Sequence, residues 1–240
     1  MTFKKATFIP VKRIVIKIAR TWGLEILKSE TWQDFKRQRE DFYLVFLQNS
    51  SGVLHVGAHH VQERFLYEKY DLNVIWIEGD SQHIELSRLL LEPFPKQTLN
   101  QIMLSDETTF DTHFYVANND GASSSLLDLV TDHGFQNLSM KGTKIVDTQR
   151  ADCFFSKEDI CAHNHLVLDV QGAELKVLKG FGRLLGEFQS LYVEVSTCPI
   201  YKNGATFYEV SRYLETFGIY PLWQPKARSH ENVLFLKFNS

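Results

Sequence analysis

The sequence has few cysteines, and none of them forms a C-x-x-C pair. Cys153, Cys161 and Cys198 are the three cysteines among 240 residues. An odd number of cysteines in an ordinary-sized domain does not suggest a disulfide framework. We therefore expect a protein of the reducing cytoplasm.

The sequence also lacks a long apolar run and an excess of positive charge. No stretch reaches the roughly eighteen apolar residues that can span a bilayer, and no apolar segment near the start precedes a small-residue cleavage site. The 26 Lys and Arg residues are outnumbered by 29 Asp and Glu residues, so the chain lacks the positive field of a protein that binds the nucleic-acid backbone. These absences predict a soluble protein with no transmembrane segment and no nucleic-acid partner.

The first 48 residues differ in composition from the rest. Six Lys and Arg residues precede the first acidic residue, Glu25. After Pro10, apolar residues follow the spacing of one helical stripe, at Val11, Ile14, Val15 and Ile18. This pattern predicts a helix docked on the main domain or on a second subunit, with contact to an anionic membrane surface as the alternative. We divide the chain into an N-terminal helical extension, 1–48, and a main domain, 49–240.

From residue 53 onward, short apolar runs alternate with helical patterns. This alternation predicts βαβ units and a parallel sheet, with a hairpin-like insertion over 108–148. Strands are expected at 53–56, 74–78, 99–104, 110–116, 144–148, 165–169, 191–195, 219–223 and 233–238. Helices are expected up to residue 70 after the first strand, and over 81–91, 174–178 and 207–217.

A glycine turn follows the first predicted strand. Gly57 allows the backbone to pass close to a ligand at the start of the following helix. A dinucleotide site needs the spacing G-x-G-x-x-G, but no further glycine occurs before Gly79. Binding of NAD or FAD is therefore disfavoured, and an NAD-dependent oxidoreductase is a less favoured interpretation of the chain.

Acidic and hydroxyl groups stand at the ends of the next strands. Glu78 ends the second strand about twenty residues after the glycine turn, where a carboxylate can accept both ribose hydroxyls of an adenosine. Ser105 and Asp106 follow the third predicted strand, where an adenine amino group would lie, although this pair is also common in turns. Asp169 ends a later apolar strand at the same carboxyl edge of the sheet.

These segments together resemble the FkbM family of methyltransferases. Members of that family carry a first motif similar to D-V-G-A-N-x-G, an acidic end to the second strand and the signature D-V-Q-G-A-E-x-x-V-L-x-G. The signature is matched from Asp169 to Gly180, and the likeness extends over about residues 53–238, including the segment 121–126. The sequence departs from the family pattern at four positions, His55, His59, Val61 and Gly79, where Asp, Asn, Gly and Pro are usual.

The resemblance implies an α/β fold of the Rossmann-like class I methyltransferase type. Its mostly parallel seven-stranded sheet has a reversed last strand and helices on both faces. It implies S-adenosylmethionine as the cofactor and O-methylation of a hydroxyl group on a saccharide or natural product. The residues expected around the donor are His55, Gly57, Ala58, Glu78, Gly79, Ser105 and Asp106, and those expected to face the acceptor are Asp169, Glu194 and Tyr201. The four departures leave an alternative, a degenerate non-catalytic member that acts as a binding or assembly module.

Methyl transfer to a hydroxyl is an in-line displacement, so the protein must align the acceptor and, where needed, remove a proton. Asp169 and Glu194 could act as the base or hold the acceptor. A divalent ion shared by the two is the less favoured alternative, because such an ion takes about six oxygen ligands. A purely structural role for Asp169, capping the following helix, is the third possibility.

Several histidines have side chains suited to metal or proton chemistry. His59 and His60 are expected to point to different helix faces, and His163 and His165 to serve a buried strand, so most of the four are interpreted as structural. His83 and His113 remain open as proton acceptors, because the ordinary pKa of histidine lies close to physiological pH.

Overall fold

The computed structural model describes residues 32–130 and 134–238. The chain divides into two compact units, one ending at Leu44 and one formed by Val45–Ser240. Helix α2 (Trp32–Gln48) is the first described element. The amphipathic helix predicted after Pro10 lies outside the described residues, and the boundary at residue 48 stays a prediction. Among the helices within 32–130 and 134–238, none combines the length and the apolar character of a transmembrane span.

The second unit is built on a seven-stranded sheet with the strand order β3-β2-β1-β7-β8-β10-β9. Strands β3, β2, β1, β7 and β8 are parallel, whereas β10 runs antiparallel to both β8 and β9. The class I fold with its reversed last strand is thereby confirmed. The strands are β1 (Val53–Val56), β2 (Val74–Glu78), β3 (Gln97–Gln101), β7 (His165–Leu168), β8 (Ser190–Ser196), β9 (Ile219–Pro221) and β10 (His230–Lys237).

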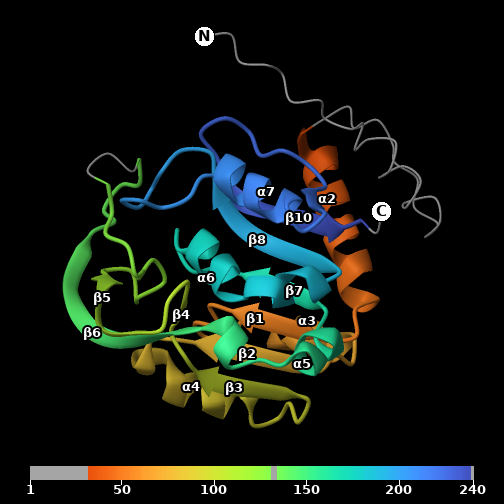
Figure 1. Cartoon of the computed structure of the whole chain (residues 1–240), viewed down its shortest axis with the longest axis horizontal. Coiled ribbons are helices and arrows are strands. Elements are labelled where there is room, and N and C mark those ends of the chain that lie inside the picture. The colour runs from red at the N-terminus through yellow and green to blue at the C-terminus, as the bar shows by residue number, and fades with distance from the viewer. Residues whose placement is uncertain (1–31, 131–133, 239–240) are drawn as a thin grey trace. The chain divides into compact units, whose positions relative to one another are not determined.

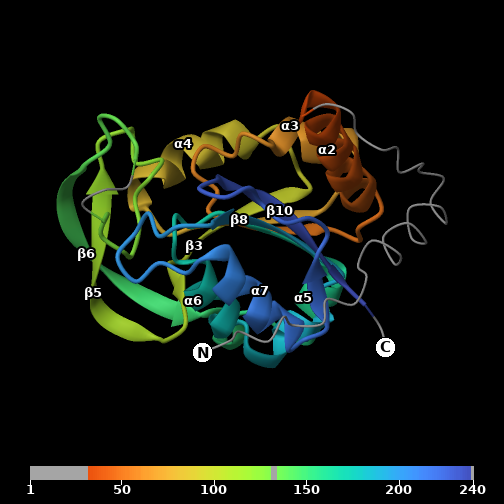
Figure 2. The same ribbon diagram turned by 90° about the horizontal axis from the view of Figure 1, so that it is seen from above.

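Helices cover both faces of this sheet (Figures 1 and 2). Figure 2 shows α3 (Arg64–Lys69) and α4 (Ser81–Leu91) on one face. The opposite face carries α5 (Lys157–Ala162), α6 (Glu174–Gly180) and α7 (Phe207–Glu215). Because helices cover both faces, the central strands β1 and β7 are buried along their whole length, as their apolar sequences predict.

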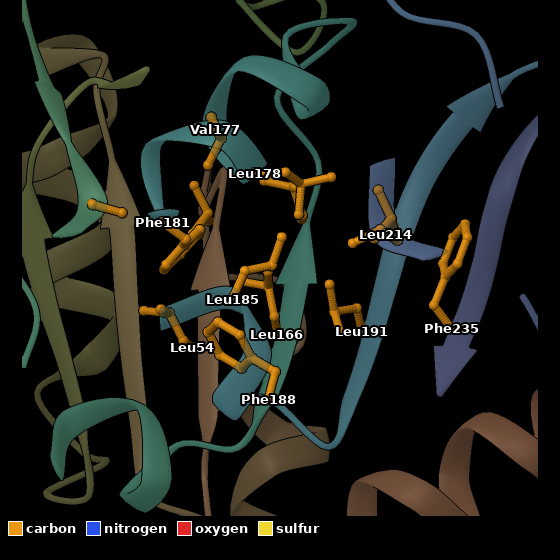
Figure 3. Packing of buried hydrophobic residues seen from close by; sticks show 14 of the residues in the cluster. Leu54, Leu166, Val177, Leu178, Phe181, Leu185, Phe188, Leu191, Leu214 and Phe235 are labelled. Atoms are coloured by element: carbon orange, nitrogen blue, oxygen red, sulfur yellow. The ribbon is translucent and has the colours of Figure 1, made fainter. Parts of the chain in front are cut away.

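An extensive apolar cluster lies between the sheet and the helices around α6 (Figure 3). Leu54, Leu166 and Leu191 project from neighbouring strands toward Phe181 and Phe188, which are both fully buried. The two phenylalanine rings meet edge to face at 5.3 Å, a favoured geometry for aromatic pairs. This core packs against β1, β7 and β8, whose carboxyl ends carry the predicted site residues.

The predicted insertion forms β5 (Thr109–Ala117) and most of β6 (Met140–Arg150), which join the preceding β4 (Leu104–Ser105) in a separate three-stranded sheet. Figure 1 shows the long β5 and β6 strands curving beside the main sheet. The single strand predicted over 99–104 is wrong. The chain leaves the main sheet after Gln101, and Leu104 and Ser105 instead pair with β6.

Candidate functional site

The carboxyl ends of β1, β2 and β7 enclose a cavity of about 210 Å³. The strand order reverses between β1 and β7, which is where open α/β sheets bind their ligands. Of the predicted site residues, the cavity is lined by His55, Gly57, Glu78, Gly79 and Asp169. We call it the donor cavity.

Glu78 is almost fully buried at the carboxyl end of β2, and burial raises the pKa of its carboxyl. Its two oxygens accept hydrogen bonds from the backbone N–H groups of His59 and Asp80, both at 2.7 Å. A carboxylate has about four lone-pair sites, so each oxygen can accept one more hydrogen bond. Glu78 is therefore oriented by the backbone and can still bind two hydroxyl groups.

The turn after β1 keeps a glycine-like backbone with only one glycine. Gly57 has φ of +93°, and a Cβ atom there would lie 1.7 Å from the carbonyl oxygen of Asp169, so contact between strands requires this glycine. His59 and Val61 also have positive φ, at a cost of about 1–2 kcal/mol per residue. Ala58 is buried beside them and donates its N–H to the Ile77 carbonyl, but it is not among the residues that line the donor cavity.

His55 lines the donor cavity, but its side chain is buried and packs beside the sheet. Its Nδ1 lies 2.8 Å from the Tyr67 hydroxyl, and its ring stacks on Trp76 at 4.4 Å. Burial, with a smaller effect of His165, lowers the pKa of His55 to about 3. The imidazole is therefore neutral at physiological pH.

Ser105 and Asp106 are not brought to the donor cavity. The Ser105 hydroxyl donates to Asp106, whose carboxylate pairs with Lys176 at 3.0 Å. This interaction belongs to the junction between β4 and α6, because the third predicted strand is split. The cavity is lined here by Ile102, Met103 and Leu104 instead.

Gln171 connects the predicted acceptor residues. The sequence interpretation did not assign it a role. Its side-chain Nε2 donates to Asp169 Oδ1 at 2.6 Å and to Glu194 Oε2 at 2.7 Å. The Tyr201 hydroxyl donates to Gln171 Oε1 at 2.8 Å. The structure therefore unites Asp169, Glu194 and Tyr201 around one amide, and the position of Gln171 inside the signature was the available signal.

A second unassigned residue, His230, lies on the far side of Glu194. Its Nε2 is 3.0 Å from Glu194 Oε1, and its Nδ1 is 2.6 Å from the Ser196 hydroxyl. No sequence signal links His230 to this site, because the contact follows from the antiparallel pairing of β10 with β8.

The two carboxyl groups that share Gln171 have different affinities for protons. Burial raises the pKa of Asp169 well above its ordinary value, and the charge of Glu194 adds to this effect. Burial acts in the same direction on Glu194, but hydrogen bonds from His230 and Asp169 outweigh it and lower the pKa of Glu194. The pair therefore holds one proton over a range of pH, with Glu194 as the ionised member.

A second cavity of about 530 Å³ opens beside Tyr201, and we call it the acceptor cavity. Glu194 and His230 form part of its wall. Its rim is rich in amide and aromatic side chains, namely Asn118, Asn119, Phe135, Gln136 and Asn137. The two cavities share Ala122 and Gln171, so they meet beside the bridging amide.

Asp169, Glu174 and Glu194 come close enough together to suggest a metal ion, with one oxygen of each within 4.8 Å of the others. With one oxygen each, the three carboxylates supply half of the six or more oxygens that Mg²⁺ or Ca²⁺ prefers. One oxygen of Glu174 already accepts the N–H groups of Val170 and Gly172. This bonding pattern favours an amide-bridged pair over a metal centre, and it gives Glu174, not Asp169, the role of fixing the turn before α6.

The histidines differ from expectation at one point. His59 and His60 do not point to different helix faces, because α3 begins only at Arg64 and both rings lie in the preceding turn, stacked at 3.9 Å. His83 lies beside them and lines the donor cavity. His113 is exposed on β5 and lines neither cavity, whereas His165 is buried with Nδ1 2.7 Å from the Ser190 hydroxyl.

The sequence profile of the methyltransferase FkbM domain matches residues 55–219. No curated protein sequence matches the chain. Among solved structures, the chain is similar to the methyltransferase domain of bacterial CtHen1 (11% identity, 84% of this chain and 98% of that chain, TM-score 0.45). It is also similar to the N-terminal domain of EvdMO1 with SAH bound (8% identity, 98% of this chain and 100% of that chain, TM-score 0.46). A third similar structure is the magnesium protoporphyrin IX methyltransferase of Synechocystis PCC 6803 with bound SAM (8% identity, 98% of this chain and 100% of that chain, TM-score 0.43).

Proposed function

Because the chain belongs to the FkbM methyltransferase family, we propose that it transfers a methyl group from S-adenosylmethionine to a hydroxyl group of a saccharide or a related natural product. The donor would occupy the cavity beside Glu78, and the acceptor the cavity beside Tyr201. The observation that carries this proposal is that Gln171 lines both cavities and bridges Asp169 and Glu194.

The residues of the donor cavity fit an adenosine. The remaining lone pairs of Glu78 suit two ribose hydroxyls, and Ile102, Leu104 and Phe114 provide apolar walls for the adenine ring. The cavity volume of about 210 Å³ is below the range of about 300–1,000 Å³ that is usual for ligand sites. We therefore expect the flexible side chain of Met103 to move when the donor binds.

The carboxylate pair would manage the proton of the acceptor. When bound, the donor supplies an electrophilic methyl group on a sulfonium. Glu194, kept ionised by His230, can accept a hydrogen bond from the acceptor hydroxyl and orient its oxygen. As the carbon–oxygen bond forms and the carbon–sulfur bond breaks, the hydroxyl proton passes to Glu194. The amide of Gln171 keeps both carboxylates in position throughout.

The acceptor cavity supports a polyhydroxylated substrate. Amide side chains both donate and accept hydrogen bonds, which suits sugar hydroxyls, and Phe135 is partly exposed at the rim. An aromatic ring offers a flat apolar surface for the C–H face of a sugar. The same features would accept other hydroxylated natural products of similar size.

A second candidate function is a binding module without catalysis. It is favoured by His55, a neutral imidazole at a position where the family usually has a carboxylate. A neutral imidazole would attract the ammonium group of the donor less strongly than a carboxylate does. Donor binding separates the two candidates.

The test is calorimetry of the full chain with S-adenosylmethionine and its demethylated product. We expect the wild type to bind both, Glu78→Ala to bind at least tenfold more weakly, and Glu85→Ala, an exposed acidic residue on α4, to bind normally. Thermal melting checks that Glu78→Ala remains folded. Absence of binding by the wild type, or unchanged binding by Glu78→Ala, would refute the donor site. Transfer of labelled methyl groups to saccharide fractions then tests the acceptor class.

A further inference from the structure

Three histidine rings gather at the edge of the donor cavity, outside the chemistry proposed above. His59 and His60 lie in the turn between β1 and α3, and His83 lies in the first turn of α4. His60 Nε2 is 3.0 Å from His83 Nδ1, and the rings of His59 and His83 are 4.4 Å apart. One ring nitrogen from each histidine lies within 4.8 Å of one from each of the others.

We propose that this histidine cluster, His59, His60 and His83, binds a divalent transition-metal ion such as Zn²⁺. Zinc binds imidazole nitrogen at about 2.0–2.1 Å and accepts three histidines with a fourth position open to water or another ligand. Tetrahedral geometry at that bond length separates the ligand atoms by about 3.3 Å. The spacing of His60 and His83 is already close to this value, and the ligand atom of His59 lies within 4.8 Å of both, so a small approach would complete the set.

The hydrogen bonding of His59 is the arrangement expected of a metal ligand. Its Nε2 lies 3.2 Å from the backbone carbonyl of Asp120. A carbonyl can only accept, so Nε2 carries the hydrogen and Nδ1 keeps its lone pair. Metal-binding histidines usually donate their second ring N–H to a carbonyl or carboxylate in this way.

The surroundings of the three rings also suit a bound ion. His59 and His60 are half-buried and His83 is buried. His83 is 5% exposed, and its Nε2 has no hydrogen-bond partner among the residues described. A Cβ atom at Gly121 would lie 2.7 Å from this Nε2, so Nε2 faces Gly121 and Nδ1, beside His60, is the atom placed to bind the ion.

A metal at this position would join segments that are distant in the sequence. It would tie the turn that carries the His59 N–H, which holds Glu78, to α4. Because only the folded chain brings the three rings together, binding should raise the melting temperature. The site does not require methyl transfer, so its test is independent of the donor assay.

The experiment uses the tag-free full chain after treatment with a chelator. Calorimetry with Zn²⁺ should give one ion per chain, and Co²⁺ should give the visible absorption of a tetrahedral site with nitrogen ligands. His60→Gln and His83→Gln should each weaken binding at least tenfold. His113→Gln is the matched control, because His113 is exposed on β5, and it should bind as the wild type does.

Three results would overturn the proposal. The wild type could fail to bind Zn²⁺ stoichiometrically, or His60→Gln and His83→Gln could bind it as tightly as the wild type. The Co²⁺ complex could also show thiolate charge-transfer bands, which would assign the ion to the exposed cysteines Cys153, Cys161 and Cys198. The spectrum of the wild type decides the ligand type even if a variant fails to fold, and circular dichroism identifies such a variant.

Discussion

Gly172 lies directly against the ring of Tyr201. A Cβ atom at position 172 would come within 2.5 Å of Tyr201 Cδ2, and Gly172 has φ of +93°. The hydroxyl of the same ring holds the side chain of Gln171. Gly172 therefore allows the turn before α6 to approach Tyr201, whose hydroxyl orients the side-chain amide of Gln171.

We expect Gly172→Ala to reduce methyl transfer at least tenfold while donor affinity changes little. The added methyl group would displace the Tyr201 ring and break its hydrogen bond to Gln171. Gly134→Ala is the matched control, because Gly134 also has positive φ, of +78°, but no atom lies within 4 Å of the added carbon. Both variants bear a backbone cost of about 1–2 kcal/mol, so only the steric effect distinguishes them. Equal transfer rates in the two variants would contradict this role of Gly172.

Gln171→Leu should slow methyl transfer roughly 10- to 100-fold. The variant removes the donor shared by Asp169 and Glu194, and a hydrogen bond to a charged group contributes about 1.5–3 kcal/mol. Single-turnover kinetics would measure the rate, and calorimetry would check that donor binding persists. Gln101→Leu, at the exposed end of β3, controls for loss of an amide elsewhere. A wild-type rate in Gln171→Leu would show that the bridge has no part in the reaction.

The sequence patterns predict the centre of the sheet well. The apolar runs of β1, β2 and β7 are short and bounded by polar residues, and strands of that kind are buried in parallel sheets. The carboxyl groups that follow such strands must meet at one edge, so Glu78 and Asp169 could be assigned to a common site. The reversed strand β10, by contrast, followed only from the family resemblance.

The errors occur where pairing between distant segments decides the structure. The stretch 99–104 is apolar at both ends, and nothing local indicates that Leu104 pairs with β6 more than forty residues later. For this reason Ser105 and Asp106 are not among the residues that line the donor cavity. The prediction for the histidine turn is wrong because positive φ at His59 delays the helix, and a helical periodicity then gives the wrong directions for the side chains.

His230→Leu should shift the acid limb of the activity profile to higher pH. Burial raises the pKa of Glu194, and the hydrogen bond from His230 opposes this effect. Without His230 the pKa of Glu194 rises, so a larger fraction of the protein molecules has a protonated, inactive Glu194 at low pH. An opposite charge at hydrogen-bond distance commonly lowers a carboxyl pKa by about one to three units, and we expect a shift of about one unit. The measurement is kcat/KM between pH 4 and 8, with His113→Leu as the control. Identical profiles would remove His230 from the site.

Glu174→Gln should change how stability depends on pH. Burial, with the charge of Glu194, raises the pKa of Glu174 from 4.5 to about 7 in the folded chain, whereas the unfolded chain ionises near the ordinary value. Between these values the folded chain binds the extra proton, so the free energy of unfolding falls as pH rises through this window. At about 1.4 kcal/mol per unit, the loss is at most about 3 kcal/mol.

The glutamine variant stays neutral and retains an oxygen that can accept the N–H groups of Val170 and Gly172. Its stability relative to the wild type should therefore improve between pH 5 and pH 8, as measured by urea unfolding at each pH. Glu158→Gln, an exposed residue on α5, should show no such trend. A constant difference between Glu174→Gln and the wild type would mean that Glu174 is already ionised in the folded chain at pH 5. Glu194 would then be held beside a charged neighbour, and the ionised member of the carboxylate pair would have to be reassigned.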